Sequence, residues 1–514
     1  RNNLYDFAIA STNDEEILER FLEGEMSYET ILDLKSILKV MQTPMAVRSS
    51  SLLEDSHYQP FAGIYSTYMI PNTGDDRDRL KMLMQCVKAV YASVYYQESK
   101  AYMTSTSNLI DEEKMAIILQ EVCGFAEGDY FFPVLSGVAR SVNFYPISPE
   151  KAEDGVVSIA YGLGKYIVDG GMSLRFSPRF PEKAIQLSTT EMMLKDTQKE
   201  FLAINLKRNI FTPKVDDAAQ LERFAVSDGD QFKSFRLVAS TYDYHDDRVV
   251  DGIQHAGVRI ITFNHFLKNS VFPLAQMMSE ILQTSSREMG KPVEIEFAIN
   301  MDVHGHHKAF NLLQIRPIVD NKENLTITPD QINPDKCIIV SESALGNGVY
   351  DNICDVIYVK PEAFNPAETW ELAQMIEQLN KQMTAEKRNY LLIGPGRWGS
   401  SDSWLGIPVK WSQISAARVI VEAGMNHFHV EPSQGTHFFQ NLTSFRVAYF
   451  TVNDFIKQGM YNTAFLNSQE ALFDNGKIRH VRFDQPMEVL VDGKKHLGVV
   501  TMPGLKAISL DLKR

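Results

Sequence analysis

The sequence lacks any apolar run of the roughly 18 residues that a membrane-spanning helix needs, and its opening residues, Arg1-Asn-Asn-Leu, do not resemble a signal peptide. Cysteine is scarce, and its few positions show no metal-ligand or redox spacing. We therefore interpret the four cysteines as buried thiols (Cys86, Cys123, Cys337 and Cys354). These absences predict a soluble protein of the cytoplasm that has no membrane partner.

Positive charge is in deficit, because 51 lysine and arginine residues stand against 65 aspartate and glutamate residues, for a net charge of −14. No basic run interleaved with aromatic residues occurs, so we expect no nucleic-acid partner. A chain of 514 residues with 44% hydrophobic content can bury sizeable cores. The sequence therefore indicates a globular protein of two or three domains.

Two segments alternate apolar and polar residues at the period of a β-strand, Glu294 to Asn300 and Asn311 to Pro317. The stretch between them is short and carries Gly305 near its middle, which predicts an antiparallel hairpin. A register centred on Gly305 sends one set of apolar side chains to a common face (Ile295, Phe297, Ile299, Leu313 and Ile315).

The same register places Glu296 opposite Gln314, and Glu294 opposite Arg316, on the other face. Carboxylate oxygens suit Mg²⁺, and a planar guanidinium spreads over phosphate charge, so this patch has the groups that phosphoryl transfer needs. The alternative is a solvated hairpin in which Glu294 and Arg316 form a cross-strand ion pair worth roughly 0.2–1 kcal/mol.

A second polar region begins with Pro44 to Asp55, typical of a strand that ends in a hydroxyl-rich turn, and continues as a small-residue loop to Thr67. Here the chain resembles the nucleotide-binding domain of the phosphoenolpyruvate synthase and pyruvate phosphate dikinase family, an ATP-grasp domain. The family pattern A-V-R-S-S-x-x-x-E-D, followed by F-A-G-x-x-x-T, is matched by Ala46 to Ser50, Glu54, Asp55, Phe61, Ala62, Gly63 and Thr67.

Further family motifs follow in the family's order, at Ala89 to Tyr95, Ile118 to Val122, Ser136 to Val138 and Tyr161 to Gly164. The hairpin described above resembles the closing signature E/D-I-E-W…L-Q-x-R-P. Six motifs across residues 44–318 are more specific than any one of them. The resemblance implies an α+β ATP-grasp domain that uses ATP with Mg²⁺.

The resemblance also implies roles for individual residues. Arg48, Gln314 and Arg316 would be the catalytic groups around the transferred phosphates, while Glu294 and Glu296 would bind Mg²⁺. The remaining ATP contacts would come from the loop and the hinge (Gly63, Thr67, Gln120, Glu121 and Val122), with hinge backbone groups meeting the adenine. An arginine that caps backbone carbonyls and an ordinary turn glycine are the alternatives at positions 48 and 63.

The sequence departs from the family at several points. It begins at Arg1 without the family's phosphate-binding Gly-Gly-Lys element, so we expect a fragment whose ATP site is incomplete. Lys165 stands where the family usually has an acid that contacts the ribose. Val138-Ala-Arg-Ser141 lacks the aromatic-x-hydroxyl pattern that usually follows Ser-Gly-Val.

The pattern along the chain predicts an ATP-grasp domain over residues 1–320, a polar linker over 321–335, and a divergent α/β C-terminal domain over 336–514. In the first domain we expect helices over 14–41, 77–103, parts of 181–224 and 273–289, with strands near 235–240 and 258–262. In the second we expect strands at 337–340 and 390–394, a helix over 367–386 with Trp370 inward, and a hairpin within 487–501.

The C-terminal part lacks the Thr/Ser-His-Ala-Ala element by which the dikinases carry phosphate on histidine. The best phospho-acceptor candidate is His437, which follows a small residue and a hydroxyl in Gln434-Gly-Thr-His, although a core histidine is the alternative. His427 and His429 lie nearby and could join it as metal ligands. Arg397, in a Gly/Pro/Ser loop, is either an anion site or part of a packed turn.

The sequence as a whole favours an ATP- and Mg²⁺-dependent phosphotransferase. By resemblance, it would pass phosphate from ATP through a phosphohistidine to a small-molecule acceptor such as pyruvate. The sequence does not identify the phosphate acceptor, and it leaves open whether the protein forms a homo-oligomer. The alternative is a regulatory module that senses ATP without turning it over. Three departures from the family favour this alternative: the missing lysine, the altered ribose contact and the absent phosphohistidine element.

Overall fold

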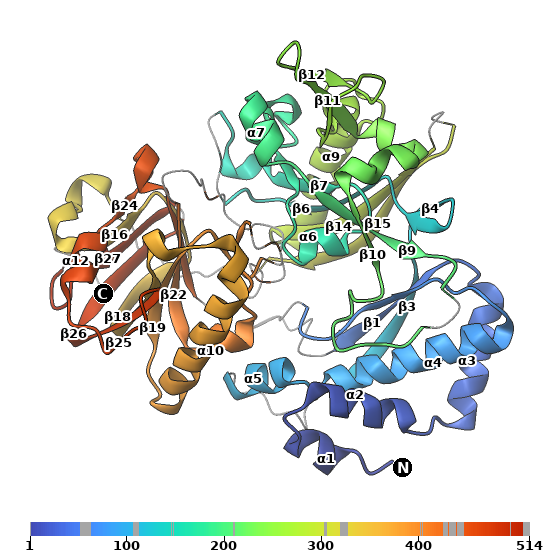
Figure 1. Ribbon diagram of the computed structural model, residues 1–514, viewed down its shortest axis with the longest axis horizontal. Helices are drawn as coiled ribbons and strands as arrows, with labels where there is room; N and C mark the ends of the chain where they lie inside the picture. Colours follow the sequence, from blue (N-terminus) through green and yellow to red (C-terminus); the bar gives the residue numbers. More distant parts are fainter. Residues whose placement is uncertain are drawn as a thin grey trace. The chain divides into compact units, whose positions relative to one another are not determined.

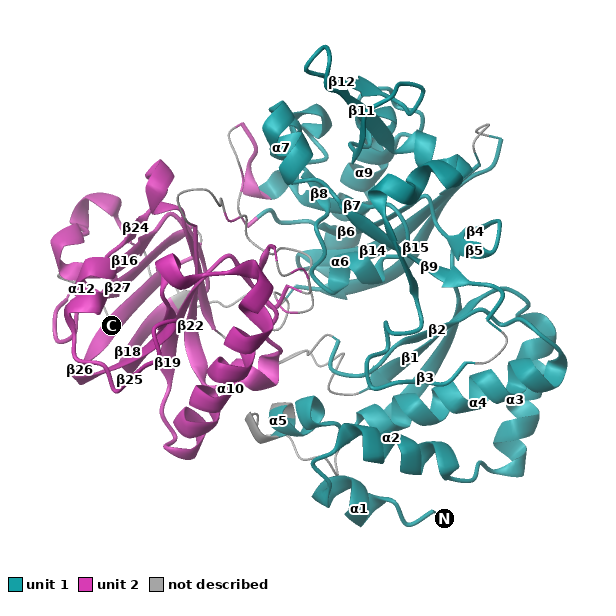
Figure 2. Cartoon of the chain, in the orientation of Figure 1, with its two compact units in different colours: residues 1–143, 153–318 teal, residues 144–152, 319–514 magenta. Residues whose placement is uncertain are grey.

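The computed structural model describes residues 2–51, 63–105, 113–144, 146, 149–208, 211–302, 306–318, 327–400, 402, 404–424, 430, 438, 447–493 and 495–506. The chain divides into two compact units (Figure 2), residues 1–143 with 153–318, and residues 144–152 with 319–514. No helix in the described ranges is long and apolar enough to cross a membrane. Cys86 and Cys337 are buried, whereas Cys123 and Cys354 are partly exposed.

The N-terminal part of the first unit is a three-stranded antiparallel sheet of order β2-β1-β3, formed by β1 (Met45–Ser51), β2 (Tyr68–Ile70) and β3 (Met115–Glu121) (Figure 1). Apolar side chains of the sheet share a buried core with those of α2 (Asp14–Glu23), α3 (Tyr28–Val40) and α4 (Asp76–Ser93). Two shorter helices complete this part, α1 (Tyr5–Ala10) and α5 (Gln97–Ser105).

The helices expected over 14–41 and 77–103 are each two helices. In the first case Gly24 is the C-terminal cap of α2. Ser27 is the N-terminal cap of α3, and its side chain accepts a hydrogen bond from the backbone N–H of Thr30. A capping serine favours a new helix start even where the apolar spacing continues. In the second case α4 ends at Ser93 and α5 begins at Gln97.

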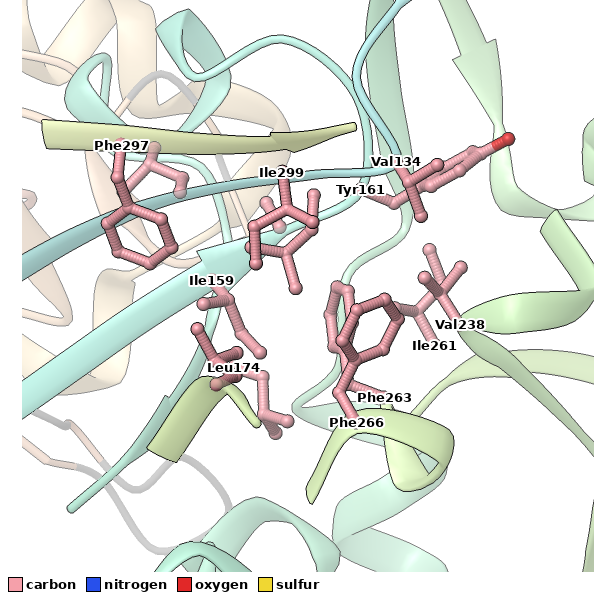
Figure 3. Packing of buried hydrophobic residues seen from close by; sticks show 14 of the residues in the cluster. Val134, Ile159, Tyr161, Leu174, Val238, Ile261, Phe263, Phe266, Phe297 and Ile299 are labelled. Atoms are coloured by element: carbon pink, nitrogen blue, oxygen red, sulfur yellow. The ribbon is translucent and has the colours of Figure 1, made fainter. Parts of the chain in front are cut away.

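A five-stranded antiparallel sheet forms the centre of the first unit, in the order β15-β14-β6-β7-β8. Its strands are β6 (Leu135–Arg140), β7 (Val156–Ala160), β8 (Leu174–Phe176), β14 (Val293–Met301) and β15 (Lys308–Pro317), and α9 (Leu274–Met289) packs against it. Figure 3 shows Phe297 and Ile299 of β14 within the same buried cluster as Ile159 of β7. This core fixes the strands that carry the candidate site.

Two smaller sheets complete the first unit, one of order β10-β9-β5-β4 and one of order β12-β11-β13. Their strands are β4 (Phe125–Glu127), β5 (Tyr130–Phe132), β9 (Glu200–Asn205), β10 (Glu222–Ala225), β11 (Ala239–Asp243), β12 (Arg248–Asp251) and β13 (Val258–Ile261), and α6 (Lys165–Val168), α7 (Thr190–Lys195) and α8 (Asn264–Leu267) lie among them. The helices expected within 181–224 reduce to α7, because the apolar run of β9 is a buried strand. The strand expected at 235–240 begins only at Ala239.

The second unit is built on one large mixed sheet, of order β17-β23-β22-β19-β18-β26-β27-β16-β24, with β25 paired to β26. Strands β18, β19, β22 and β23 run parallel to one another, and the rest of the sheet is antiparallel. Its elements are β16 (Cys337–Ser341), β17 (Ser343–Leu345), β18 (Asn347–Val359), β19 (Tyr390–Pro395), β22 (Ala417–Ala423), β23 (Ala448–Val452), β24 (Met460–Tyr461), β25 (Phe473–Asp474), β26 (Ile478–Asp492), β27 (Leu497–Thr501), α10 (Thr369–Ala385) and α12 (Thr463–Ser468), beside a small pair of β20 (Arg397–Trp398) and β21 (Gly406–Ile407).

Two details of the second unit differ from expectation. Trp370 is 64% exposed, so it does not join the inward face of α10. Part of the expected linker packs on the second unit, because Ile327 is fully buried and its backbone N–H donates to Asp492 Oδ2 at 2.9 Å. Lys495 Nζ donates in turn to the carbonyl oxygen of Ile327.

Candidate functional site

The hairpin of β14 and β15 carries the first half of the candidate site. Glu294 pairs with Arg316 and Glu296 pairs with Gln314, which confirms the expected register at these positions. Beyond Glu296 a β-bulge shifts the pairing by one residue. The polar side chains at these paired positions share a face because directly opposite residues of an antiparallel pair point the same way.

The apolar face of the hairpin is only partly as expected. Ile295, Phe297 and Ile299 of β14 are buried. Ile315, in contrast, is 36% exposed, so the expectation that it fills the core is wrong. The two strands differ in their place in the sheet. β15 is an edge strand and is therefore more exposed, whereas β14 lies between two partner strands.

The second half of the site comes from β1 and β3 of the three-stranded sheet. Arg48 of β1 donates from Nη2 to Gln314 Oε1 at 2.7 Å and from Nη1 to Gln120 Oε1 at 3.4 Å. One guanidinium thus joins the three-stranded sheet of β1 and β3 to β15 of the five-stranded sheet. The arginine is held by side-chain amides, which differs from the alternative of an arginine that caps backbone carbonyls.

Arg316 links the remaining polar groups of the hairpin. Its Nη2 donates to Glu296 Oε1 at 2.7 Å and to Gln314 Oε1 at 3.0 Å. The five predicted side chains Arg48, Glu294, Glu296, Gln314 and Arg316 therefore lie in one connected cluster. Such a cluster can bind a polyanion, because planar guanidinium groups bond phosphate oxygens in pairs.

Arg140 is a member of the cluster that sequence reasoning missed. Its Nε and Nη2 each lie 2.6 Å from Glu294 Oε2, and the two residues are 3% and 2% exposed. Breaking such a buried pair costs about 3–5 kcal/mol, because one charge is left without compensation. With Arg140 included, three guanidinium groups stand against two carboxylates, so positive charge is in excess where phosphates would bind.

The two glutamates differ as possible Mg²⁺ ligands. Glu294 is committed to Arg140, whereas the Glu296 side chain is 18% exposed and has one oxygen bonded to Arg316. Within the described ranges, no three His, Cys, Asp or Glu side chains gather into a metal cluster. Mg²⁺ commonly takes one or two carboxylates and completes its shell with water and substrate phosphates, and Glu296 fits that pattern.

The expected hinge, Gln120 to Val122, makes hydrogen bonds within the first unit through a side chain and through the backbone. Gln120 is occupied by Arg48, and the backbone N–H of Val122 donates to the carbonyl oxygen of Pro44 at 2.8 Å. Two apolar side chains are exposed, Ile118 at 45%, the first residue of the expected hinge motif, and Leu312 at 47%, which the sequence did not single out. Ile118 pairs directly with Arg48 in the ladder, so both share a face of the sheet.

The loop before β2 is only partly described, since Glu54, Asp55, Phe61 and Ala62 lie outside the described ranges. Gly63 has a φ of 71°, a conformation that favours glycine. The backbone N–H of Thr67 donates to Asp217 Oδ2 at 2.7 Å. Asp217 Oδ1 in turn lies 2.8 Å from Lys165 Nζ, so the loop is tied to the start of α6.

Lys165 is a buried structural cation. It also reaches Asp169 Oδ2 at 3.2 Å. Burial alone would lower the pKa of Lys165, but Asp169 and Asp217 outweigh that effect and raise it above its usual value. Burial raises the pKa of Asp169, an effect that Lys165 opposes. The residue that replaces the expected ribose-binding acid thus forms an internal ion cluster.

Packing explains the residues of the Ser-Gly-Val motif, Ser136 to Val138. Ser136 Oγ donates to the carbonyl oxygen of Gly162 at 2.7 Å, which joins this motif to Tyr-Gly-Leu-Gly. A Cβ at Gly137 would overlap the ring of Phe297. Only glycine at this position lets the aromatic residue of the hairpin lie against β6.

Replacing Gly137 with alanine is expected to lower the free energy of unfolding by about 1–3 kcal/mol, because the added methyl group overpacks the core against Phe297. Urea denaturation measures this loss. The double variant Gly137→Ala/Phe297→Leu is expected to lose less stability than the sum of the two single variants, because the aromatic ring that the new methyl group would overlap is no longer present. Additive losses would show that Gly137 has another role.

In the second unit, Arg397 belongs to the packed turn of β20. Its backbone N–H donates to Leu405 O at 2.7 Å, and the neighbouring Trp398 N–H donates to Glu422 Oε1 at 2.9 Å. His437, His427 and His429 lie outside the described ranges. The candidate site therefore rests on the first unit alone.

Comparison with known proteins agrees with this placement. Residues 3–335 match the family model described as the pyruvate phosphate dikinase AMP/ATP-binding domain. The uncharacterized phosphotransferase YvkC of Bacillus subtilis (strain 168) is 32% identical over 129 residues, which are 25% of this chain and 14% of that protein. The chain thus matches only a small part of that relative. Because the family model covers more than half of the 514 residues, the protein belongs to the family of the pyruvate phosphate dikinase AMP/ATP-binding domain.

Proposed function

We propose that the protein is a phosphotransferase that binds ATP with Mg²⁺ between the β1–β3 sheet and the β14–β15 hairpin. The single observation that carries the proposal is the bonded series from Gln120 through Arg48, Gln314 and Arg316 to Glu296. It gathers cations, amides and a carboxylate from the three-stranded sheet and from the β14–β15 hairpin. The groups match the chemistry of phosphoryl transfer, which depends on positioning and charge neutralisation.

Within this proposal each residue has a defined task. Arg48 and Arg316 bind and orient the phosphate oxygens, and Gln314 keeps the two guanidinium groups in place. Glu296 would hold Mg²⁺, which when bound neutralises phosphate charge. Ile118 and Leu312 offer exposed apolar surface for a flat base beside the hinge.

For the acceptor, we propose transfer through a histidine to a small molecule such as pyruvate, with His437 as the candidate within this chain. The test is to incubate the protein with ATP labelled at the β-phosphate and to map any acid-labile, base-stable label by mass spectrometry. Label on His437 supports the route. Label on another histidine removes His437, and turnover without protein label indicates direct transfer.

A sensor that binds ATP without turnover is the second candidate. The observation that favours it is Lys165, which is tied to Asp169 and Asp217 where the resemblance expects a ribose-binding acid. ATP binding without release of ADP, AMP or phosphate over many hours would establish this function.

Replacing Glu296 with glutamine is expected to weaken Mg²⁺-dependent ATP binding by about 10–100-fold, because one carboxylate among few protein ligands carries much of the metal affinity. Calorimetry at moderate salt measures this change. Glu19→Gln, at an exposed position of α2, is the control and is expected to leave the affinity unchanged. Equal affinity of wild type and Glu296→Gln would refute the metal assignment.

A further inference from the structure

The inference concerns Arg140 and rests on the function proposed above. We propose that Arg140 takes the place of a divalent cation at Glu294, so that the site takes up one divalent cation with ATP, through Glu296, rather than two. Arg140 is then a specificity-determining residue for metal binding. Glu294 is a positioning residue and not a metal ligand.

The contacts of Glu294 support this assignment. Arg140 approaches Glu294 Oε2 with two nitrogens, both at 2.6 Å, while Arg316 Nε lies 4.0 Å from Oε1. The carboxylate thus lies between two guanidinium groups, one at each oxygen. Its charge is already compensated before any ligand binds, and a cation would have to compete with Arg140 for the same oxygen.

Burial makes that competition unequal. The side chains of Arg140 and Glu294 are 4% and 3% exposed, so a cation that displaced Arg140 would have to break a buried ion pair, a strongly destabilising step. Arg140 pairs with Glu294 in the ladder between β6 and β14, so the backbone itself holds the two side chains together.

Glu296 stands in a different environment. It pairs in the same ladder with Val138, an apolar residue that cannot compensate its charge. Its Oε1 accepts a hydrogen bond at 2.7 Å from Arg316 Nη2, on the edge strand β15. Two carboxylates on one face of one strand therefore differ in what lies beside them on β6, an arginine in one case and a valine in the other.

The experiment counts bound Mn²⁺ by electron paramagnetic resonance, in the full chain saturated with ATP. Wild type is expected to bind one Mn²⁺ per ATP. Glu296→Gln is expected to weaken that binding by about 10–100-fold, as for loss of a ligand. Glu294→Gln, the matched change two residues away, is expected to keep the count at one and to weaken the binding less than Glu296→Gln does, because it removes no ligand of the cation.

Arg140→Met supplies the opposite test, because it releases the Glu294 carboxylate. This variant is expected to bind a second Mn²⁺ with ATP and to gain more thermal stability from Mn²⁺ than wild type does. If Arg140→Met or Glu294→Gln does not fold, the number of Mn²⁺ ions bound per ATP by wild type still decides. Two Mn²⁺ per ATP in wild type, or equal losses in the two glutamine variants, would overturn the inference and leave the proposed function intact. Failure of wild type to bind ATP at all would instead overturn the proposed function, and the inference with it.

Discussion

Replacing Arg48 with methionine is expected to weaken ATP binding by at least about 100-fold. Arg48 contacts Gln314 and Gln120, so its guanidinium lies where both sheets present polar groups. A hydrogen bond to a charged group contributes about 1.5–3 kcal/mol, and two such bonds to phosphate oxygens correspond to at least about 3 kcal/mol. Each 1.4 kcal/mol is about tenfold in affinity, which gives the expected loss. Isothermal calorimetry with Mg²⁺ and ATP measures it.

Arg48→Lys is the matched variant for this prediction. Lysine keeps the positive charge but lacks the planar fork that reaches two acceptors at once, so its loss is expected to be about tenfold. Thermal unfolding of both variants shows whether the fold persists. Equal affinities of Arg48→Met and wild type would show that Arg48 only joins the two sheets and does not contact the nucleotide.

The hairpin was predictable because its information is local. The period-two alternation and the central glycine define which side chains share a face, and Glu294–Arg316 and Glu296–Gln314 are paired as expected. The bulge after Glu296 was not predictable, since an inserted residue leaves the sequence pattern of each strand nearly unchanged. Its effect appears beyond the polar cluster, where Phe297 pairs with Leu312.

The partner of Glu294 could not be predicted from local pattern. Arg140 lies 154 residues away in the sequence and meets Glu294 only because β6 pairs with β14. A signal was nevertheless present, since Val138-Ala-Arg-Ser141 replaces an aromatic pattern of the family with a charge. An arginine within an apolar strand needs a buried acid as partner.

Lys165 presents the same difficulty. In the sequence this lysine is a departure from the family pattern, which predicts only the loss of the ribose contact. The structure places it between Asp169 and Asp217, two acids with no common motif. Long-range ion clusters of this kind depend on the fold, and spacing along the chain does not reveal them.

The last prediction follows from this cluster. Replacing Lys165 with methionine is expected to lower the free energy of unfolding of the first unit by about 1.5–3 kcal/mol, because Asp169 and Asp217, whose side chains are 31% and 18% exposed, would lose the charged hydrogen bonds of their shared cation. The loss should grow as the pH rises through the raised pKa of Asp169, because a partly buried carboxylate without its cation is costly only when it is charged. Urea denaturation at neutral pH measures the change.

The control is Arg248→Met, which removes a cation that is 62% exposed and paired with Asp246, itself 55% exposed. An exposed pair contributes at most about 1 kcal/mol, so this variant should remain close to wild type. Adding Asp217→Asn to Lys165→Met should restore part of the loss, because it removes one uncompensated charge while its amide can still accept the N–H of Thr67. If Lys165→Met costs no more than Arg248→Met, the cluster does not stabilise the fold, and the lysine has another role.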